Sequence, residues 1–394
     1  MSKNLSYQRT IYACFTSAAV QAIICNFAPL LFLIFNRSYQ IPLSKITFLI
    51  TVNFLVQLAV DLIATGVVSK IGYRISIVAS QFLAALGFVL LAVLPDLCSD
   101  PYIGIMTATV TYAMGGGLIE VLASPIMEAC PTDNKEKSMS LLHSFFCWGH
   151  VVVVLVTTIF FKIFGTENWR IMTLIWALVP FINAFAFLGA PIATLEDEEE
   201  QGVPIKELLL SKVFWVFMIM MLCSGASEIA VSQWASVFAE KGLGVSKAIG
   251  DLAGPMAFAI LMGSSRFYYG KCGDKMDLDR FMLLSSILCV ISYLAISFID
   301  NPIVGLIGCA VCGLSVGIMW PGTLSKASAM LKGGTAMFAL FAVAGDVGCS
   351  AGPTLAGLVS SSMGDNLRIG ILSAIVFPLI LLACVIGFRK KTTP

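Results

Sequence analysis

Long runs of hydrophobic residues separated by short polar turns make up most of the chain. A helix needs about 20 apolar residues to cross the hydrocarbon core of a bilayer. Runs of that length recur along the sequence at 11–35, 45–68, 75–94, 102–129, 139–161, 171–190, 212–238, 248–269, 281–299, 303–323, 335–360 and 369–388. The pattern predicts an all-α membrane protein with twelve transmembrane helices. No small-residue cleavage site follows the first run, so we expect it to be retained as the first span.

One long polar stretch, 191–211, separates the sixth run from the seventh and carries the acidic cluster 196–200. It predicts a linker between two pseudo-symmetric six-helix bundles, residues 1–190 and 212–394. If the N-terminus is cytoplasmic, most of the 24 lysine and arginine residues fall in cytoplasmic turns. Because positive loops stay inside, we expect both termini and the linker on the cytoplasmic side of a plasma or inner membrane.

Composition excludes several classes of function. The chain is 58% hydrophobic and 12% charged, with a mean hydropathy of +0.92 and a net charge of +1, which gives no electrostatic reason to bind nucleic acid. It has no nucleophile elbow, phosphate-binding glycine loop or metal-ligand spacing, so we expect neither an enzyme nor an ATP-driven pump, and no cofactor or metal. Cys309 and Cys312 form a CxxC inside an apolar run, where a packing role is favoured.

Ionisable residues inside the apolar runs are the main candidates for function, because burying a charge in a membrane is costly. They include Asp61, Glu120, His143, Glu228 and Asp346. Glu120 lies in the fourth run, three residues after the end of a glycine triplet at 115–117. A carboxyl group in a low-dielectric cavity can carry a proton near neutral pH. The alternative is that Glu120 is a permanently hydrogen-bonded packing residue.

Polar and aromatic side chains at helical spacing suggest a site for a polar solute. Asn53, Gln57 and Asp61 follow one another at four-residue intervals and therefore share one face of the second span. A sugar-like ligand has polar edges and apolar faces, which amide and indole groups can match. The further candidates for this site are Asn26, His143, Trp148, Glu228, Gln233, Trp234, Trp320 and Asp346. Hydrogen bonds between helices are the alternative reading of the polar members.

The 6 + 6 arrangement with a central linker resembles the major facilitator superfamily, whose halves rock around a midplane site. The turns after the second and eighth spans match its glycine–acid–basic signature in part: Gly66 to Arg74 has Ser69 at the acidic position, and the stretch from Arg266 to Lys275 is looser. A further segment, Gly348 to Gly357, resembles the glycine–proline motif of drug:proton antiporters, although that motif belongs in the fifth span.

Within the superfamily the chain resembles the fucose–galactose–glucose:proton symporter branch. Gly117-Leu-Ile-Glu120 is similar to the segment with that branch's proton-coupling glutamate, which implies this role for Glu120. His143-Ser144-Phe145 is similar to a stretch with a sugar-contacting asparagine, so His143 takes that place. The first span keeps Asn26 but has Pro29 where the branch carries an aspartate, and Asp61 is the acid that can substitute for it.

These observations lead to one expected function and two alternatives. We expect a monomeric secondary active transporter that moves a small polar solute, sugar or sugar-like, by alternating access. Symport with protons, through Glu120, Asp61 and His143, is the expected coupling, and sodium is the other candidate ion. The first alternative is a proton-driven exporter of drugs or metabolites. The second is a membrane receptor or sensor that transports nothing.

Overall fold

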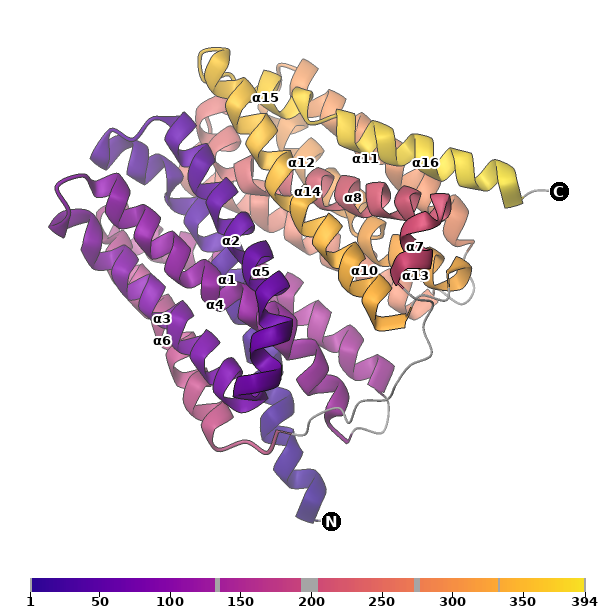
Figure 1. Ribbon diagram of the computed structural model, residues 1–394. Coiled ribbons are helices and arrows are strands. Elements are labelled where there is room, and N and C mark those ends of the chain that lie inside the picture. Colours follow the sequence, from indigo (N-terminus) through magenta and orange to yellow (C-terminus); the bar gives the residue numbers. More distant parts are fainter. Residues whose placement is uncertain (1, 132–134, 193–204, 273–276, 332–333, 393–394) are drawn as a thin grey trace. The chain divides into compact units, whose positions relative to one another are not determined.

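The computed structural model describes residues 2–131, 135–192, 205–272, 277–331 and 334–392, and the regular elements among them are helices (Figure 1). Twelve helical segments in this part of the chain are long and apolar enough to cross a membrane. The prediction of an all-α membrane protein with twelve spans is therefore confirmed. The predicted acidic cluster at 196–200 lies outside the described residues.

Contacts along the chain divide it into two units. One comprises Met1–Pro42 and Val52–Glu198, and the other comprises Leu43–Thr51 and Glu199–Pro394. We refer to them as the N-terminal and C-terminal units. The first turns of the second span, Leu43–Thr51, thus group with the C-terminal unit. The predicted division into residues 1–190 and 212–394 places this segment in the N-terminal bundle instead.

The N-terminal unit is built around its first helix. Its helices are α1 (Ser2–Tyr39), the part of α2 (Leu43–Ile71) from Val52 onward, α3 (Tyr73–Leu97), α4 (Pro101–Ala129), α5 (Lys135–Phe164), the short η1 (Thr166–Asn168) and α6 (Trp169–Leu188). The apolar stretch of α1 is 89% buried, compared with 39% for α5. α1 packs against α4, α5 and α6, and α3 packs against α4 and α6. Polar side chains on α1 therefore meet protein on nearly every side.

The C-terminal unit has more interruptions in its spans. Its elements are α7 (Ile205–Leu210), α8 (Lys212–Val237), η2 (Phe238–Gly242), α9 (Lys247–Asp251), η3 (Leu252–Met256), α10 (Ala257–Cys272), α11 (Leu278–Phe298), α12 (Pro302–Val316), α13 (Met319–Met330), α14 (Gly334–Ser362), α15 (Leu367–Ser373) and α16 (Val376–Thr392). The tenth span divides between α12 and α13 just before Pro321. Because proline has no N–H, the carbonyl of Gly317 four residues earlier cannot receive its helical hydrogen bond.

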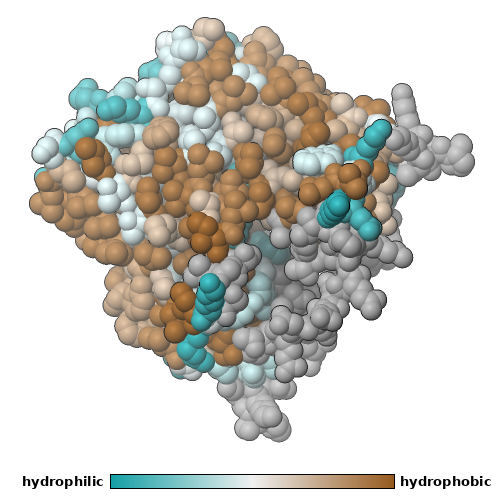
Figure 2. All heavy atoms as spheres, viewed as in Figure 1, coloured by the Kyte–Doolittle hydropathy of each residue, from teal (hydrophilic) through white to brown (hydrophobic). Residues whose placement is uncertain are grey.

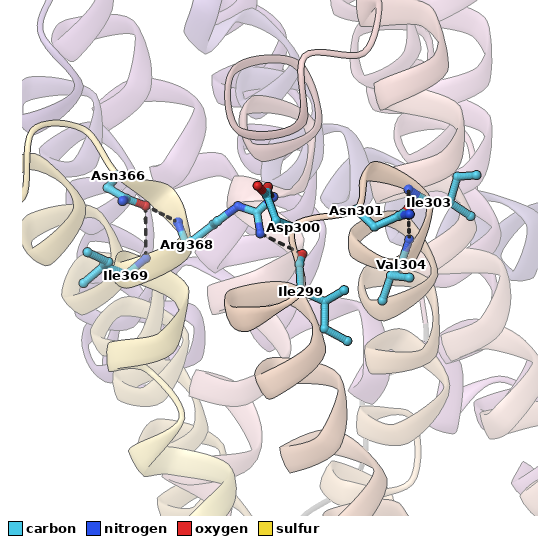
Figure 3. Close-up of polar contacts among 8 residues, drawn as sticks. All are labelled: Ile299, Asp300, Asn301, Ile303, Val304, Asn366, Arg368 and Ile369. Atoms are coloured by element: carbon cyan, nitrogen blue, oxygen red, sulfur yellow. Dashed lines mark hydrogen bonds and ion pairs between the residues drawn. The ribbon is translucent and has the colours of Figure 1, made fainter.

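Each unit uses an aspartate–arginine pair to join two helix ends. In the C-terminal unit Arg368, at the start of α15, donates from Nη2 to Asp300 (2.9 Å) and from Nη1 to the Ile299 carbonyl (2.7 Å), where α11 ends (Figure 3). In the N-terminal unit Arg170, at the start of α6, binds Asp96 near the end of α3 at 2.6 Å. The local sequences, Asn-Trp-Arg-Ile and Asn-Leu-Arg-Ile, form a short internal repeat.

Hydrophobic residues predominate among those coloured in Figure 2, and hydrophilic residues lie between them in smaller groups. Large apolar residues are exposed along the spans; Leu62, Ile182 and Ile303 are each more than half exposed. Contact with lipid is favourable for such exposed apolar residues, whereas a soluble protein would bury them. The surface agrees with the membrane assignment that the helices give.

Candidate functional site

The three glycines before Glu120 allow close contacts with neighbouring helices of the N-terminal unit. A Cβ at position 115 would lie 2.7 Å from the Ser80 carbonyl oxygen of α3, and one at position 117 would lie 2.8 Å from the Gln57 carbonyl oxygen of α2. A Cβ on Gly116 would lie 3.1 Å from two amide oxygens, those of Gln21 and Gln57. The triplet therefore brings α4 close to α2 and α3 and leaves space next to Gly116 for the polar side chains of Gln21 and Gln57.

Gln21 of α1 is the hub of this cluster. Its Nε2 donates to Gln57 Oε1 on α2 at 2.7 Å and to Glu120 Oε2 on α4 at 3.3 Å. Gln21 and Gln57 are both buried, whereas Glu120 is exposed. The cluster thus connects two interior amides to a carboxylate that is exposed on the surface of the structure.

Two buried oxygen atoms of this cluster have no hydrogen-bond partner in the described structure. Both hydrogens of Gln21 Nε2 are used by the two bonds above, while its Oε1 is buried with no hydrogen-bond partner. One turn from Gln57, the Oδ1 of Asn53 is likewise buried and unpartnered; Gln57 Nε2 donates to the Asn53 backbone carbonyl at 3.4 Å. Buried acceptors of this kind usually have a partner, so they mark positions where a ligand's donors can bind.

The predicted carboxylates lie next to these amides. Asp61 follows Gln57 by one helical turn on α2, and Glu120 follows Gly116 by one turn on α4, so each is on the helix face that carries the cluster. Asp61 is half-buried, and one of its oxygens is sealed from solvent. Of the sequence candidates, Asn53, Gln57, Asp61 and Glu120 therefore belong to one region around Gln21.

Three other candidates of the N-terminal unit are placed differently. Asn26 is buried, and its amide donates to the Ala22 carbonyl of its own helix at 2.9 Å. His143 and Trp148 are exposed on α5, with Trp148 51% exposed. Beside His143, the Phe145 ring stacks on Phe15 of α1 with the ring centres 4.5 Å apart. α5 is thus held against α1 next to His143.

In the C-terminal unit Glu228 takes part in a buried ion pair. Arg266 Nη2 of α10 lies 3.0 Å from Glu228 Oε2 of α8, and the two side chains are only 22% and 11% exposed. The sequence places Arg266 at the turn that follows the eighth span; the structure instead shows it inside α10. Its Nε also donates to the Gly317 carbonyl at 3.4 Å, the carbonyl that Pro321 leaves without a helical partner.

The tryptophan candidates of this unit are packing residues in the described conformation. Trp234 is fully buried, and its indole donates to the Pro353 carbonyl at 3.0 Å. Trp320 is half-buried and lies against the backbone of Gly345, where it leaves no space for a Cβ. Gln233 is buried beside Trp234, and Asp346 is half-buried on α14. Trp234 offers no ring face to a solute here.

The segment that resembles the antiporter motif has a packing explanation. Gly348 and Gly352 of α14 lie directly against the backbone of Leu222 and Ala226 of α8, with no room for a side chain. Small residues at this spacing allow two helices to approach closely in a membrane. The glycines of this segment are therefore accounted for by the contact between α8 and α14.

Neither Gln21 nor the Arg266 partner of Glu228 was predicted as part of a site from the sequence. Gln21 and Asn26 are the two amides of the first run, and an amide within a span is the signal that could have identified Gln21. The pairing of Glu228 with Arg266 crosses 38 residues, so only the packing of α8 near α10 reveals it.

One family model and several solved structures are similar to this chain. The sequence model of the Major Facilitator Superfamily matches residues 11–353. The D-xylose–proton symporter superposes with a TM-score of 0.78 at 14% identity, over 99% of this chain and 98% of that one. A bacterial homolog of the human lysosomal transporter Spinster, inward-facing and occupied, gives 0.77 at 13%, over 98% and 97%. The E. coli fucose:proton symporter gives 0.66 at 16%, over 99% and 100%. No curated protein sequence matches the chain.

Proposed function

Because the chain belongs to the major facilitator superfamily, we propose that it is a proton-coupled secondary transporter for a small polar solute, with a sugar-like compound as the first class to test. The solute binds at the Gln21 cluster of the N-terminal unit, and Glu120 carries the proton. Two of the similar structures are sugar:proton symporters by description. At their low identity these proteins support the fold, and the polar cluster supports the chemistry.

The bond between Gln21 and Glu120 carries this proposal. Gln21 Nε2 donates to Glu120 Oε2 at 3.3 Å, so protonation of Glu120 weakens the acceptor of a buried amide. That amide also holds Gln57 at 2.7 Å. A change of charge at the exposed carboxylate therefore reaches the groups that bind the solute, which is the link that coupling requires.

Asp61 is the second carboxylate in the proposed mechanism. It lies on the same face of α2 as Gln57 and can hold a charge while Glu120 is protonated. In the membrane orientation we propose, both chain ends face the cytoplasm and a proton gradient directed inward drives solute uptake. Outward movement of the solute under the same gradient would assign the chain to proton antiport instead.

Reconstituted liposomes test the coupling role. We expect the wild-type protein to accumulate a radiolabelled solute when the outside is more acidic. Glu120→Gln keeps the size of the side chain but cannot ionise, so this variant should lose accumulation and retain exchange of labelled for unlabelled solute across the membrane. Glu167→Gln, the same substitution at an exposed residue of η1, is the matched control. Undiminished accumulation by Glu120→Gln would refute the proposal.

A further inference from the structure

Two arginines from different helices meet at the carboxyl end of α6. Arg74, in the first turn of α3, donates from Nη1 to the carbonyls of Phe187 (3.1 Å) and Leu188 (2.9 Å). Arg9 of α1 donates from Nη2 to the Phe185 carbonyl at 3.4 Å. The last carbonyls of a helix have no partner within the helix and attract cations, so these bonds cap α6. They also bring two guanidinium groups to the same turn.

Positive charge gathers at this end of α6 and is open to the surroundings. Arg9 and Arg74 are both exposed, and so is Lys70, four residues before Arg74 at the end of α2. The acceptors in the two arginine caps are backbone carbonyls, which are neutral groups. At the opposite end of the same helix pair, Arg170 instead binds the carboxylate of Asp96 at 2.6 Å. The two ends of the α3–α6 pair therefore differ in charge.

The two arginines lie at the ends of membrane spans. The apolar span of α1 begins at Tyr7, that of α3 begins at Tyr73, and that of α6 ends at Leu188. Arg9 and Arg74 are thus within two residues of the start of their spans. The ends of a span lie near the boundary between the hydrocarbon core and the lipid headgroups. A lipid phosphate in the same leaflet is therefore at the depth of both guanidinium groups.

An exposed apolar surface begins beside these arginines. Ile75, next to Arg74, is 62% exposed, and Phe185 is 51% exposed. Deeper in the spans, the ring centre of Phe82 on α3 lies 5.9 Å from that of Phe185 and 6.0 Å from that of Phe181, both on α6. Because α3 and α6 pack against each other, these rings form one apolar surface across the two helices. An acyl chain can lie on it below a headgroup held at the end of α6.

We propose that the end of α6, with Arg9 and Arg74, binds the phosphate of an acidic phospholipid. A guanidinium group has five N–H donors on three nitrogens, and the bonds to α6 use one nitrogen of each arginine. Its planar shape matches two oxygens of a phosphate, and acidic lipids attract basic residues at the ends of membrane helices. The bound lipid joins α1, α3 and α6 at one end of the N-terminal unit. This site is separate from the solute site and does not depend on the solute.

Native mass spectrometry of the purified full-length protein in detergent tests the proposal. The probes are phosphatidylglycerol and phosphatidylcholine with the same acyl chains. Each basic residue near an acidic lipid contributes about 1 kcal/mol, which is about fivefold in affinity. We therefore expect phosphatidylglycerol to bind at least about fivefold more tightly than phosphatidylcholine. Arg9→Gln and Arg74→Gln should each lower the affinity for phosphatidylglycerol about fivefold and leave phosphatidylcholine binding unchanged.

An arginine of the C-terminal unit supplies the matched control. Arg280 of α11 is also exposed, so Arg280→Gln removes the same charge elsewhere on the surface and should bind phosphatidylglycerol as the wild type does. Melting temperatures without added lipid report the loss of the α6 cap in each variant. If Arg74→Gln does not fold, Arg9→Gln still tests the proposal, because its one bond to α6 is long at 3.4 Å.

Several results would overturn the proposal. Equal affinity of the wild type for the two lipids would show that the charge of the headgroup is not recognised. An equal loss in Arg280→Gln and Arg9→Gln would indicate general attraction to a positive protein, with no site at α6. Equal losses for both lipids in Arg9→Gln and Arg74→Gln, together with lower melting temperatures, would leave the arginines as helix caps only. Displacement of phosphatidylglycerol by glycerol 1-phosphate would make this a site for a free phosphate compound.

Discussion

The buried ion pair Glu228–Arg266 should have a larger coupling free energy in unfolding than the exposed ion pairs of the C-terminal unit. With Nη2 and Oε2 3.0 Å apart, the centres of the two charged groups are roughly 4 Å apart. At an effective dielectric constant of about 20, two unit charges at that distance attract by about 4 kcal/mol. Removing one partner leaves the other buried and uncompensated, which typically costs about 3–5 kcal/mol.

A double-mutant cycle measures this dependence. Glu228→Gln and Arg266→Gln should each lower the free energy of unfolding by about 3–5 kcal/mol, whereas the double variant should lose little more than either single one. The measurement is denaturant unfolding in detergent micelles, followed by tryptophan fluorescence. The same cycle on Lys241–Asp365, whose side chains are 38% and 40% exposed, should give a coupling of at most about 1 kcal/mol.

One result would refute the reasoning about the buried pair. If the losses of Glu228→Gln and Arg266→Gln simply add, with a coupling below about 0.5 kcal/mol, the two groups do not compensate each other. The pair would then be an incidental contact, and the separation of α12 from α13 near Gly317 would not be connected to Arg266.

Three further outcomes follow from the contacts described above. Gly115→Ala should destabilise the N-terminal unit by about 1–3 kcal/mol, because the added Cβ meets the Ser80 carbonyl oxygen at 2.7 Å; a melting temperature equal to wild type would contradict this. Asn183→Ala should cost a similar amount in the same melting assay, since its amide donates to the Ala13 carbonyl and Ser17 Oγ of α1 and to Gln81 Oε1 of α3, and its removal takes a donor from these buried acceptors. Cys309 and Cys312 are fully buried, so maleimide should label them only after denaturation; rapid labelling of the folded protein in detergent would show that α12 is accessible.

The number and type of elements were predictable because they depend on local sequence. A run of about 20 apolar residues must form a helix in a bilayer, where backbone groups have no water to bond. Breaks within spans were less predictable. Pro321 indicated a weak point, but the end of α12 at Val316 depends also on the close approach of Gly317 to Ser265 of α10.

Several residues of the candidate site were predictable from the sequence, whereas the contacts between them were not. The spacing of Asn53, Gln57 and Asp61 placed them on one face, and the cost of a charge in a span singled out Glu120. The sequence could not show that Gln21 joins them, because that contact connects residues 36 and 99 positions apart. Nor could it show that Trp234 is buried with its indole bonded to the Pro353 carbonyl. A tryptophan in a span has the same local sequence pattern whether it packs against other helices or binds a solute.

The sequence by itself determined that this protein crosses a membrane twelve times and keeps a few ionisable groups inside it. Hydropathy and helix length are local properties, and placing an apolar run in water or a charge in lipid costs much free energy. Tertiary structure alone decided which polar groups meet: Gln21 with Gln57 and Glu120 in one unit, and Glu228 with Arg266 in the other. Hydrogen bonds and ion pairs depend on distances of about 3 Å between helices. Such distances follow from how small residues such as Gly116 let helices pack, which no single span specifies.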